Sequence, residues 1–225
     1  MGVAGEGETD ADRPAGVLAR GPWDPERVEV RWSEQPFEPD DQTAAAADAA
    51  LAELGDRGSP THDGLGARVA SYEHRPDGIV LDMQPVRWAL RLAGDAVDSI
   101  SSLCVVRDVD GRWLAGRRAP WVASWAGRWA LGAGGAVEVG ENPAETLARE
   151  LEEEWSVTPE RLSAEALIRL PTGLLLFVGL AQLPAGAEVK IDPEHDAHAW
   201  WPAAIEDWPD EADAPLRLMA TMLAG

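Results

Sequence analysis

Residues 143–155 form the segment that most restricts what this chain can fold into. Their apolar side chains recur at intervals of three and four, which predicts an amphipathic helix with one face in a core. Asn142 is placed to cap this helix, Pro143 suits its first position, and Glu145 stands three residues after the cap. The apolar stripe consists of Ala144, Leu147, Ala148, Leu151 and Trp155.

Three carboxylates occupy another face of the predicted helix. Glu150, Glu153 and Glu154 are spaced i, i+3 and i+4, so their side chains project to one side. Like charges at this spacing repel, and the helix gains no stability from them. Magnesium takes oxygen ligands and accepts a few carboxylates beside water and substrate phosphates. The pattern therefore indicates a cation site, which Arg149, four residues before Glu153, is placed to orient.

A glycine-rich segment precedes the helix. It has the sequence Gly132-Ala-Gly-Gly-Ala-Val-Glu-Val-Gly-Glu141. Because glycine lets the backbone approach a ligand closely, we expect a loop here, with Gly134 and Gly135 in contact with substrate. Glu141 adds one more carboxylate just before the helix.

Together these residues resemble the Nudix box, a family motif of the form glycine, five residues, glutamate, seven residues, Arg-Glu-aliphatic-any-Glu-Glu-any-Gly-aliphatic. Every spacing matches, and one position departs, because Ser156 stands where the family has glycine. The segment from Glu194 to Pro202 (EHDAHAWWP) is similar to a downstream family segment that often completes the metal site. The matching positions are Gly135, Glu141, Arg149, Glu150, Leu151, Glu153, Glu154 and Val157.

The resemblance implies a hydrolase that cleaves a diphosphate linkage in a small organic substrate with Mg²⁺, or Mn²⁺ as the alternative ion. It implies metal binding by Glu150, Glu153, Glu154 and Glu194, and catalytic roles for Glu150, Glu153 and Arg149. Glu153, Glu150 and Glu194 are all candidates for the general base. Besides the two glycines, the candidates for phosphate contact are Arg117, Arg118 and Arg128, and those for ring stacking are Trp121, Trp125 and Trp129.

The resemblance also implies the fold class, an α+β chain with an α-β-α sandwich whose mixed β-sheet is flanked by helices. We expect residues 1–16 to be a disordered tail, 17–94 a small N-terminal α+β extension, and 95–225 the Nudix domain. Predicted elements are strands at 26–32, 128–131, 166–170 and 174–183, helices at 43–54 and 215–223, hairpins around 75–78 and 108–111, and an acidic, loop-rich segment at 188–213.

Composition narrows the partners. The formal net charge is -21, which opposes contact with a nucleic acid polymer or an anionic membrane surface. The single cysteine, Cys104, rules out an intrachain disulfide, so a cytoplasmic location is expected. The sequence leaves open whether the protein forms a homodimer.

Two other functions remain as alternatives. The first is a Nudix-fold ligand-binding or regulatory module without catalysis, against which the intact set of glutamates argues. The second is an isoprenoid-type isomerase. It is suggested by the segment 132–135, which lacks the Pro-Gly-Gly sequence common in nucleotide-cleaving members of the family. That chemistry uses a cysteine in the pocket, and Cys104 is expected in a core strand instead. The sequence does not select among nucleoside diphosphate sugars, ADP-ribose, dinucleotide cofactors and noncanonical nucleoside triphosphates.

Overall fold

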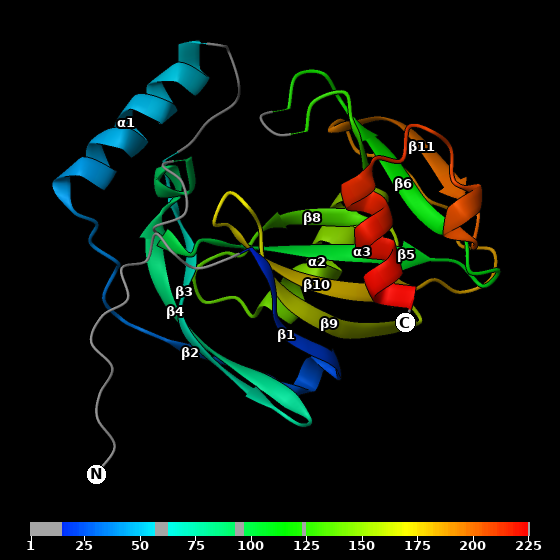
Figure 1. Cartoon of the computed structure of the whole chain (residues 1–225), viewed down its shortest axis with the longest axis horizontal. Coiled ribbons are helices and arrows are strands. Elements are labelled where there is room, and N and C mark those ends of the chain that lie inside the picture. The colour runs from blue at the N-terminus through cyan, green and yellow to red at the C-terminus, as the bar shows by residue number, and fades with distance from the viewer. Residues whose placement is uncertain (1–14, 57–62, 93–96, 123–124, 225) are drawn as a thin grey trace.

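A mixed sheet of eight strands dominates the computed structural model, which describes residues 15–56, 63–92, 97–122 and 125–224 (Figure 1). Six strands follow the order β1-β9-β10-β5-β6-β11, while β8 pairs with β5 and β7 with β6. β10 and β5 are parallel, and the other pairs are antiparallel. The strands are β1 (Gly16–Trp23), β5 (Ile100–Arg107), β6 (Trp113–Arg118), β7 (Trp129–Leu131), β8 (Ala133–Ala136), β9 (Arg161–Arg169), β10 (Leu175–Gln182) and β11 (His195–Trp201).

A second sheet of three strands has the order β2-β4-β3. Three α-helices and three 3-10 helices complete the described part of the chain. The remaining elements are β2 (Val28–Trp32), β3 (Leu65–Arg75), β4 (Gly78–Arg87), α1 (Asp41–Asp56), α2 (Pro143–Trp155), α3 (Ala214–Ala224), η2 (Pro25–Arg27), η3 (Trp88–Leu92) and η5 (Ile205–Asp207).

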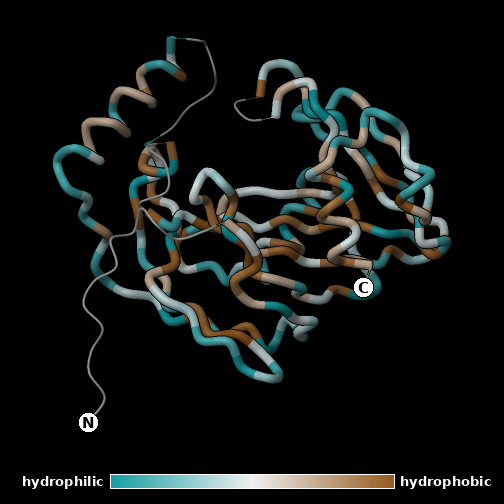
Figure 2. Tube along the Cα trace, in the orientation of Figure 1, coloured by the Kyte–Doolittle hydropathy of each residue, from teal (hydrophilic) through white to brown (hydrophobic). Residues whose placement is uncertain are grey.

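Helices α2 and α3 cover opposite faces of the large sheet. Side chains alternate between these two faces along each strand, so neighbouring residues of one strand belong to different cores. On β5, Cys104 belongs to the core that includes α2, whereas the next residue, Val105, belongs to the core that includes α3. Figure 2 shows brown, hydrophobic stretches along strands of both sheets. The α-β-α sandwich with a mixed, helix-flanked sheet is therefore confirmed.

The small sheet shares the α2-side core. Ile79, Leu81 and Met83 of β4 are fully buried there together with Leu147 and Leu151 of α2. Backbone contacts join the two sheets as well, because the amide of Val69 donates to the carbonyl of Asp98 at 3.0 Å. The small sheet is thus held against the helix that bears the carboxylates.

Three expectations about the elements need correction. The glycines expected in a loop form strand β8, because their backbone pairs with β5, with Gly134 opposite Leu103 and Gly135 opposite Ser102. The acidic segment expected to be loop-rich contains β11, whose apolar Trp201 packs in the α3-side core. Residues 17–23, assigned to the N-terminal extension, belong to β1, which pairs with β9 in the large sheet. The predicted tail lies almost wholly outside the described residues, and the division at 94/95 remains a prediction.

Helix α2 forms as the sequence predicts. The Asn142 side chain accepts from the Ala144 amide at 2.9 Å, and the Glu145 carboxylate accepts from the Asn142 amide at 3.1 Å, which completes a capping box. At the other end, Ser156 adopts the left-handed conformation with φ 52°. Glycine tolerates that conformation best, which explains why the family motif has glycine there.

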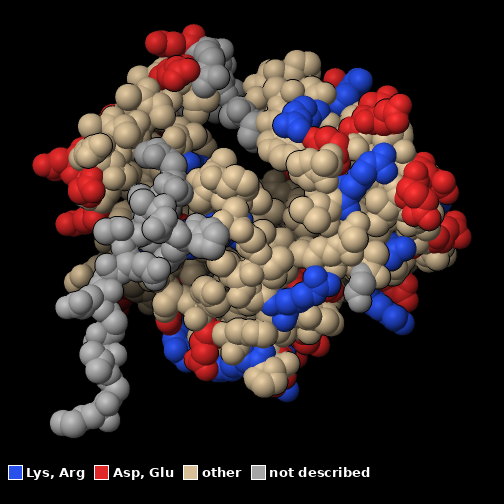
Figure 3. Space-filling model, in the orientation of Figure 1, with Lys and Arg blue, Asp and Glu red and all other residues tan. Residues whose placement is uncertain are grey.

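Acidic side chains gather over α1 and at the β11 end of the molecule in Figure 3. None of the described helices combines the length and the apolar character needed to cross a membrane.

Candidate active site

The three predicted carboxylates of α2 differ in their exposure. Glu150 and Glu154 are buried, with only 7% and 6% of their surface exposed, whereas Glu153 is exposed. Buried carboxylates need compensating partners, since burial disfavours their charged form. The site is therefore defined by the contacts of this buried pair.

Arg149 binds three carboxylates at once. Its guanidinium lies 2.8 Å from Glu141, 2.7 Å from Glu150 and 3.0 Å from Glu153, and it also donates to the carbonyl of Ala136 at 3.3 Å. The hydrogen bond to Glu141 is the largest cause that raises the pKa of Arg149. This residue thus orients the acidic cluster, as its spacing predicted.

Glu154 lies deeper, between β8 and β6. Its Oε1 accepts from the Gly134 amide at 3.3 Å and lies 3.9 Å from Nη1 of Arg118. Burial raises the pKa of Glu154 to about 8, with a further contribution from Glu150, while Arg118 and the Gly134 amide act in the opposite direction. Burial also raises the pKa of Glu150. Both carboxylates are therefore poorly compensated as anions.

The two glycines predicted to contact substrate both lie against the carboxylates. Gly134 donates its amide to Glu154. A Cβ atom at Gly135 would collide with the Glu150 carboxylate. A larger residue at this position would therefore displace the Glu150 carboxylate, which packs directly on the backbone of β8.

The chemistry of the site fits a hard divalent cation. Its donors are carboxylate oxygens on one helix face, and two of them are buried side by side with raised pKa values, an arrangement that a cation would stabilise. Within the described ranges, no three Asp, Glu, His or Cys side chains converge as a metal cluster. Arg149 and Arg118 hold the carboxylates in ion pairs instead, which a bound cation would have to rearrange.

The remaining predicted residues divide into two groups. Glu194 joins the site through Arg118, which lies 2.8 Å from Glu194 and also faces Glu154. Arg117 pairs with Asp196 at 2.6 Å, and Arg128 pairs with Asp213. The structure thus brings Arg118 and Glu194 to the carboxylates and engages the other two arginines elsewhere.

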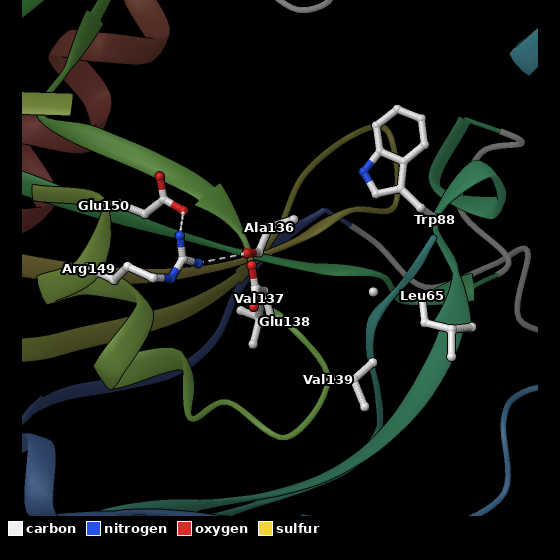
Figure 4. Close-up of a pocket in the computed structure, with 9 residues that line it drawn as sticks. Leu65, Trp88, Ala136, Val137, Glu138, Val139, Arg149 and Glu150 are labelled. Atoms are coloured by element: carbon white, nitrogen blue, oxygen red, sulfur yellow. Dashed lines mark hydrogen bonds and ion pairs between the residues drawn. The ribbon is translucent and has the colours of Figure 1, made fainter. Parts of the chain in front are cut away.

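A cleft of about 450 Å³ opens beside Glu150 and Arg149 (Figure 4). One wall comes from the end of β8 and the loop that follows it, and the opposite wall comes from the small sheet and η3. The lining residues are Leu65, Gly66, Trp88, Ala136, Val137, Glu138, Val139, Arg149 and Glu150.

The aromatic residue that lines this cleft is not one of those predicted to stack on a ligand, and their stacking role stays a prediction. Trp121, Trp125 and Trp129 do not line the cleft, whereas Trp88 does. Trp125 and Trp129 are engaged by Arg128 and Trp201 respectively. No local pattern indicates Trp88, because its position depends on how the small sheet packs against the large one.

Cys104 lies apart from the site, whereas Nε2 of His195 lies 3.9 Å from the Glu154 carboxylate. Cys104 is fully buried in the core and does not line the cleft, and burial raises the pKa of its thiol. His195 is buried against Trp155, with ring centroids 4.8 Å apart, and its Nδ1 lies 2.9 Å from Asp192. Burial lowers the pKa of His195, which favours the neutral ring.

The α-β-α sandwich thus presents a capped acidic helix to a cleft. The sequence profile of the NUDIX domain matches residues 99–216, more than half of the chain. The chain therefore belongs to the Nudix family and is a pyrophosphohydrolase, which confirms the resemblance seen in the sequence.

Other comparisons describe more distant likenesses. No curated protein matches the chain in sequence. A MutT protein from Methanosarcina mazei Go1 is 24% identical with a TM-score of 0.42, over 56% of this chain and 94% of that one. The NUDIX domain of Shewanella oneidensis NrtR, solved with ADP ribose, is 18% identical with a TM-score of 0.45, over 56% and 88%. A C. elegans Ap4A hydrolase is 19% identical with a TM-score of 0.43, over 56% and 95%.

Proposed function

We propose that this protein hydrolyses the diphosphate linkage of a nucleoside diphosphate-linked or similar small organic substrate with Mg²⁺, for which Mn²⁺ can substitute. The observation that carries the proposal is the buried pair Glu150 and Glu154 beside a cleft large enough for such a ligand. A small molecule is the expected partner rather than a nucleic acid polymer or a membrane, since the net charge is -21. The lone cysteine suits the reducing cytoplasm.

Glu150, Glu153 and Glu154 would hold the cation, with Glu194 as a further ligand from β11's N-terminal side. A bound divalent cation supplies neutralisation of phosphate charge and activation of water. Arg149 keeps Glu150 and Glu153 on a common side by donating to both. The amide of Gly134 holds the Glu154 carboxylate in place by donating a hydrogen bond to it.

Glu150 is the candidate base with the best placement. It lines the cleft, whereas neither Glu153 nor Glu194 does. Burial raises the pKa of Glu150, which makes its carboxylate a stronger proton acceptor than an exposed one. In the proposed reaction it accepts a proton from the attacking water, the water oxygen bonds to phosphorus, and the bond from phosphorus to the bridging oxygen breaks, so that the other phosphate leaves with that oxygen.

A substrate panel tests the proposal. Nucleoside diphosphate sugars, ADP-ribose, dinucleotide cofactors and noncanonical nucleoside triphosphates are incubated with Mg²⁺ or Mn²⁺ in ¹⁸O-labelled water. We expect cleavage of at least one class, with one ¹⁸O atom in a phosphate product and no cleavage in EDTA. Failure of every class in both metals would refute the proposal, and binding without cleavage would favour the regulatory module.

Glutamine variants then assign the roles. Glu150→Gln is expected to lower turnover by about two to four orders of magnitude because it removes both a charged metal ligand and the base. Glu152→Gln is the matched control, since Glu152 is exposed on the same helix and outside the cluster. Equal turnover in these two variants would contradict the assignment of Glu150.

A further inference from the structure

The cleft beside the acidic helix has two chemically different ends. Arg149 and Glu150 form its charged end, and Leu65, Val139 and Trp88 form its apolar end, with residues 136–138 between them. Figure 4 shows Trp88 and Leu65 on the side opposite Arg149 and Glu150. A ligand that fills the whole cleft therefore needs a charged part joined to an apolar or aromatic part.

The apolar end is accessible from solvent. Leu65 is 59% exposed and Val139 is 43% exposed, although both are large apolar side chains. Burial of such side chains by a ligand ring would contribute to affinity, since apolar surface gains free energy when it leaves water. Single exposed apolar residues are ordinary, but here two of them border the same cleft as an indole.

Trp88 is held in place by its neighbours. Its amide donates to the carbonyl of Gly64 at 2.8 Å, and the guanidinium of Arg91 lies over the indole, 5.4 Å from the ring centroid. Arg91 in turn donates to the hydroxyl of Ser101 at 3.4 Å. Ser101 is the register partner of Ala136, which lines the cleft. This chain of contacts ties η3 to the same strand pair that supports the carboxylates.

The rest of the small-sheet wall is anchored to the large sheet. Arg68 forms a β-bridge with Ser99, one residue before β5, and its Nε donates to the carbonyl of Val97 at 2.8 Å. The wall is thus positioned relative to α2 by backbone contacts rather than by a linker alone. A preorganised wall loses little entropy when a ligand packs on it.

We infer that the small sheet and η3 form the specificity wall of the active site, and that Trp88 packs against an aromatic ring in the organic part of the diphosphate substrate. The inference rests on the proposed function, because the charged end is taken to hold the diphosphate. It selects ring-bearing diphosphates over those that carry only an alkyl or inorganic group. Trp88 is a specificity-determining residue that lies before the segment matched by the NUDIX profile.

Binding measurements separate the two ends of the cleft. The probes are the α,β-methylene analogue of ADP, which has a base and resists cleavage, and methylenediphosphonate, which has no ring. Calorimetry with Mg²⁺ present gives the dissociation constant of each for the full-length protein. We expect the wild type to bind the ring-bearing probe at least tenfold more tightly than the ringless one.

Two variants change the apolar end in opposite ways. Trp88→Ala removes the stacking surface and should weaken the ring-bearing probe by about tenfold to a hundredfold, while the ringless probe changes less than twofold. Trp88→Phe should restore most of the affinity. Gly66→Val adds bulk where a Cβ would meet no atom within 4 Å, so it should narrow the cleft and weaken only the ring-bearing probe. Tyr72→Ala, at an exposed aromatic residue of β3 outside the cleft, is the matched control.

The outcomes distinguish this inference from the proposed function. Equal weakening of both probes, or no weakening in Trp88→Ala and Gly66→Val, overturns the inference. A wild-type protein that cleaves a diphosphate but shows no preference for the ring-bearing probe overturns the inference alone. A protein that shows the expected preference but cleaves no diphosphate in the panel overturns the proposed function and leaves the specificity wall standing.

Discussion

Replacement of Glu154 by glutamine gives the sharpest test of the buried carboxylates. Glu154 has its ordinary pKa of 4.5 raised to about 8, chiefly by burial. The folded protein therefore holds this proton more tightly than the unfolded chain does. The resulting stability is fully present below pH 4.5 and is lost as the pH rises through about 8. Above that pH the buried anion only destabilises the metal-free fold.

The magnitude follows from the two pKa values. A rise from 4.5 to about 8 corresponds to a ceiling of about 5 kcal/mol at roughly 1.4 kcal/mol per pH unit. Glutamine has nearly the same shape and still accepts from the Gly134 amide, but it carries no charge. In EDTA at pH 8.5, we expect Glu154→Gln to raise the free energy of unfolding by about 2–5 kcal/mol over the wild type. At pH 4.5 the difference should nearly vanish.

Urea unfolding in EDTA at several pH values provides the measurement, and Glu152→Gln is the control for the same change on an exposed position. With Mg²⁺ at about 100 times its dissociation constant, the wild type should gain about 2.7 kcal/mol, and the variant should lose most of that gain together with turnover. A variant no more stable than the wild type at pH 8.5, or equally stabilised by Mg²⁺, would refute the reasoning.

Three other substitutions test neighbouring features. Gly135→Ala should displace the Glu150 carboxylate and lower turnover by at least tenfold. Gly55→Ala is the control and should leave turnover unchanged, because a Cβ there meets no atom within 4 Å. Equal kcat values for the two variants would contradict the packing argument. Ser156→Gly should stabilise the protein by about 1 kcal/mol in urea unfolding because φ is 52°, and a loss of stability would show that Ser156 is not strained. Arg149→Lys keeps the charge but cannot bridge three carboxylates, so kcat/KM should fall by about tenfold to a hundredfold; an unchanged value would remove the orienting role.

Local patterns in the sequence predicted α2 and its capping box because both depend on residues within one helix. The spacing of Glu150, Glu153 and Glu154 likewise placed them on one face, and Arg149 contacts Glu150 and Glu153. These features require no knowledge of the rest of the fold. Their agreement with the structure shows how much of the candidate site lies within a single element.

Features that depend on packing between distant segments were not predictable. Strand β8 forms because Gly134 and Gly135 pair with β5, and glycine alone indicates a loop as readily as a strand. Burial divides the three carboxylates into a buried pair and an exposed Glu153, which spacing does not reveal. Trp88 reaches the cleft only through the contact between the two sheets.

Strand β1 has a consequence for how the protein is made. It is synthesised near the beginning, but its partner β9 comes about 150 residues later, with Ala19 opposite Leu167. At a synthesis rate of about 5–20 residues per second, β9 is made roughly 7–30 seconds after β1, and β1 has no partner strand in the large sheet until then. During that delay the small sheet can form without it, and the β1 edge of the large sheet closes only after β9 has been made. A fragment without residues 16–23 would leave the backbone groups of β9 open to other chains, which favours aggregation.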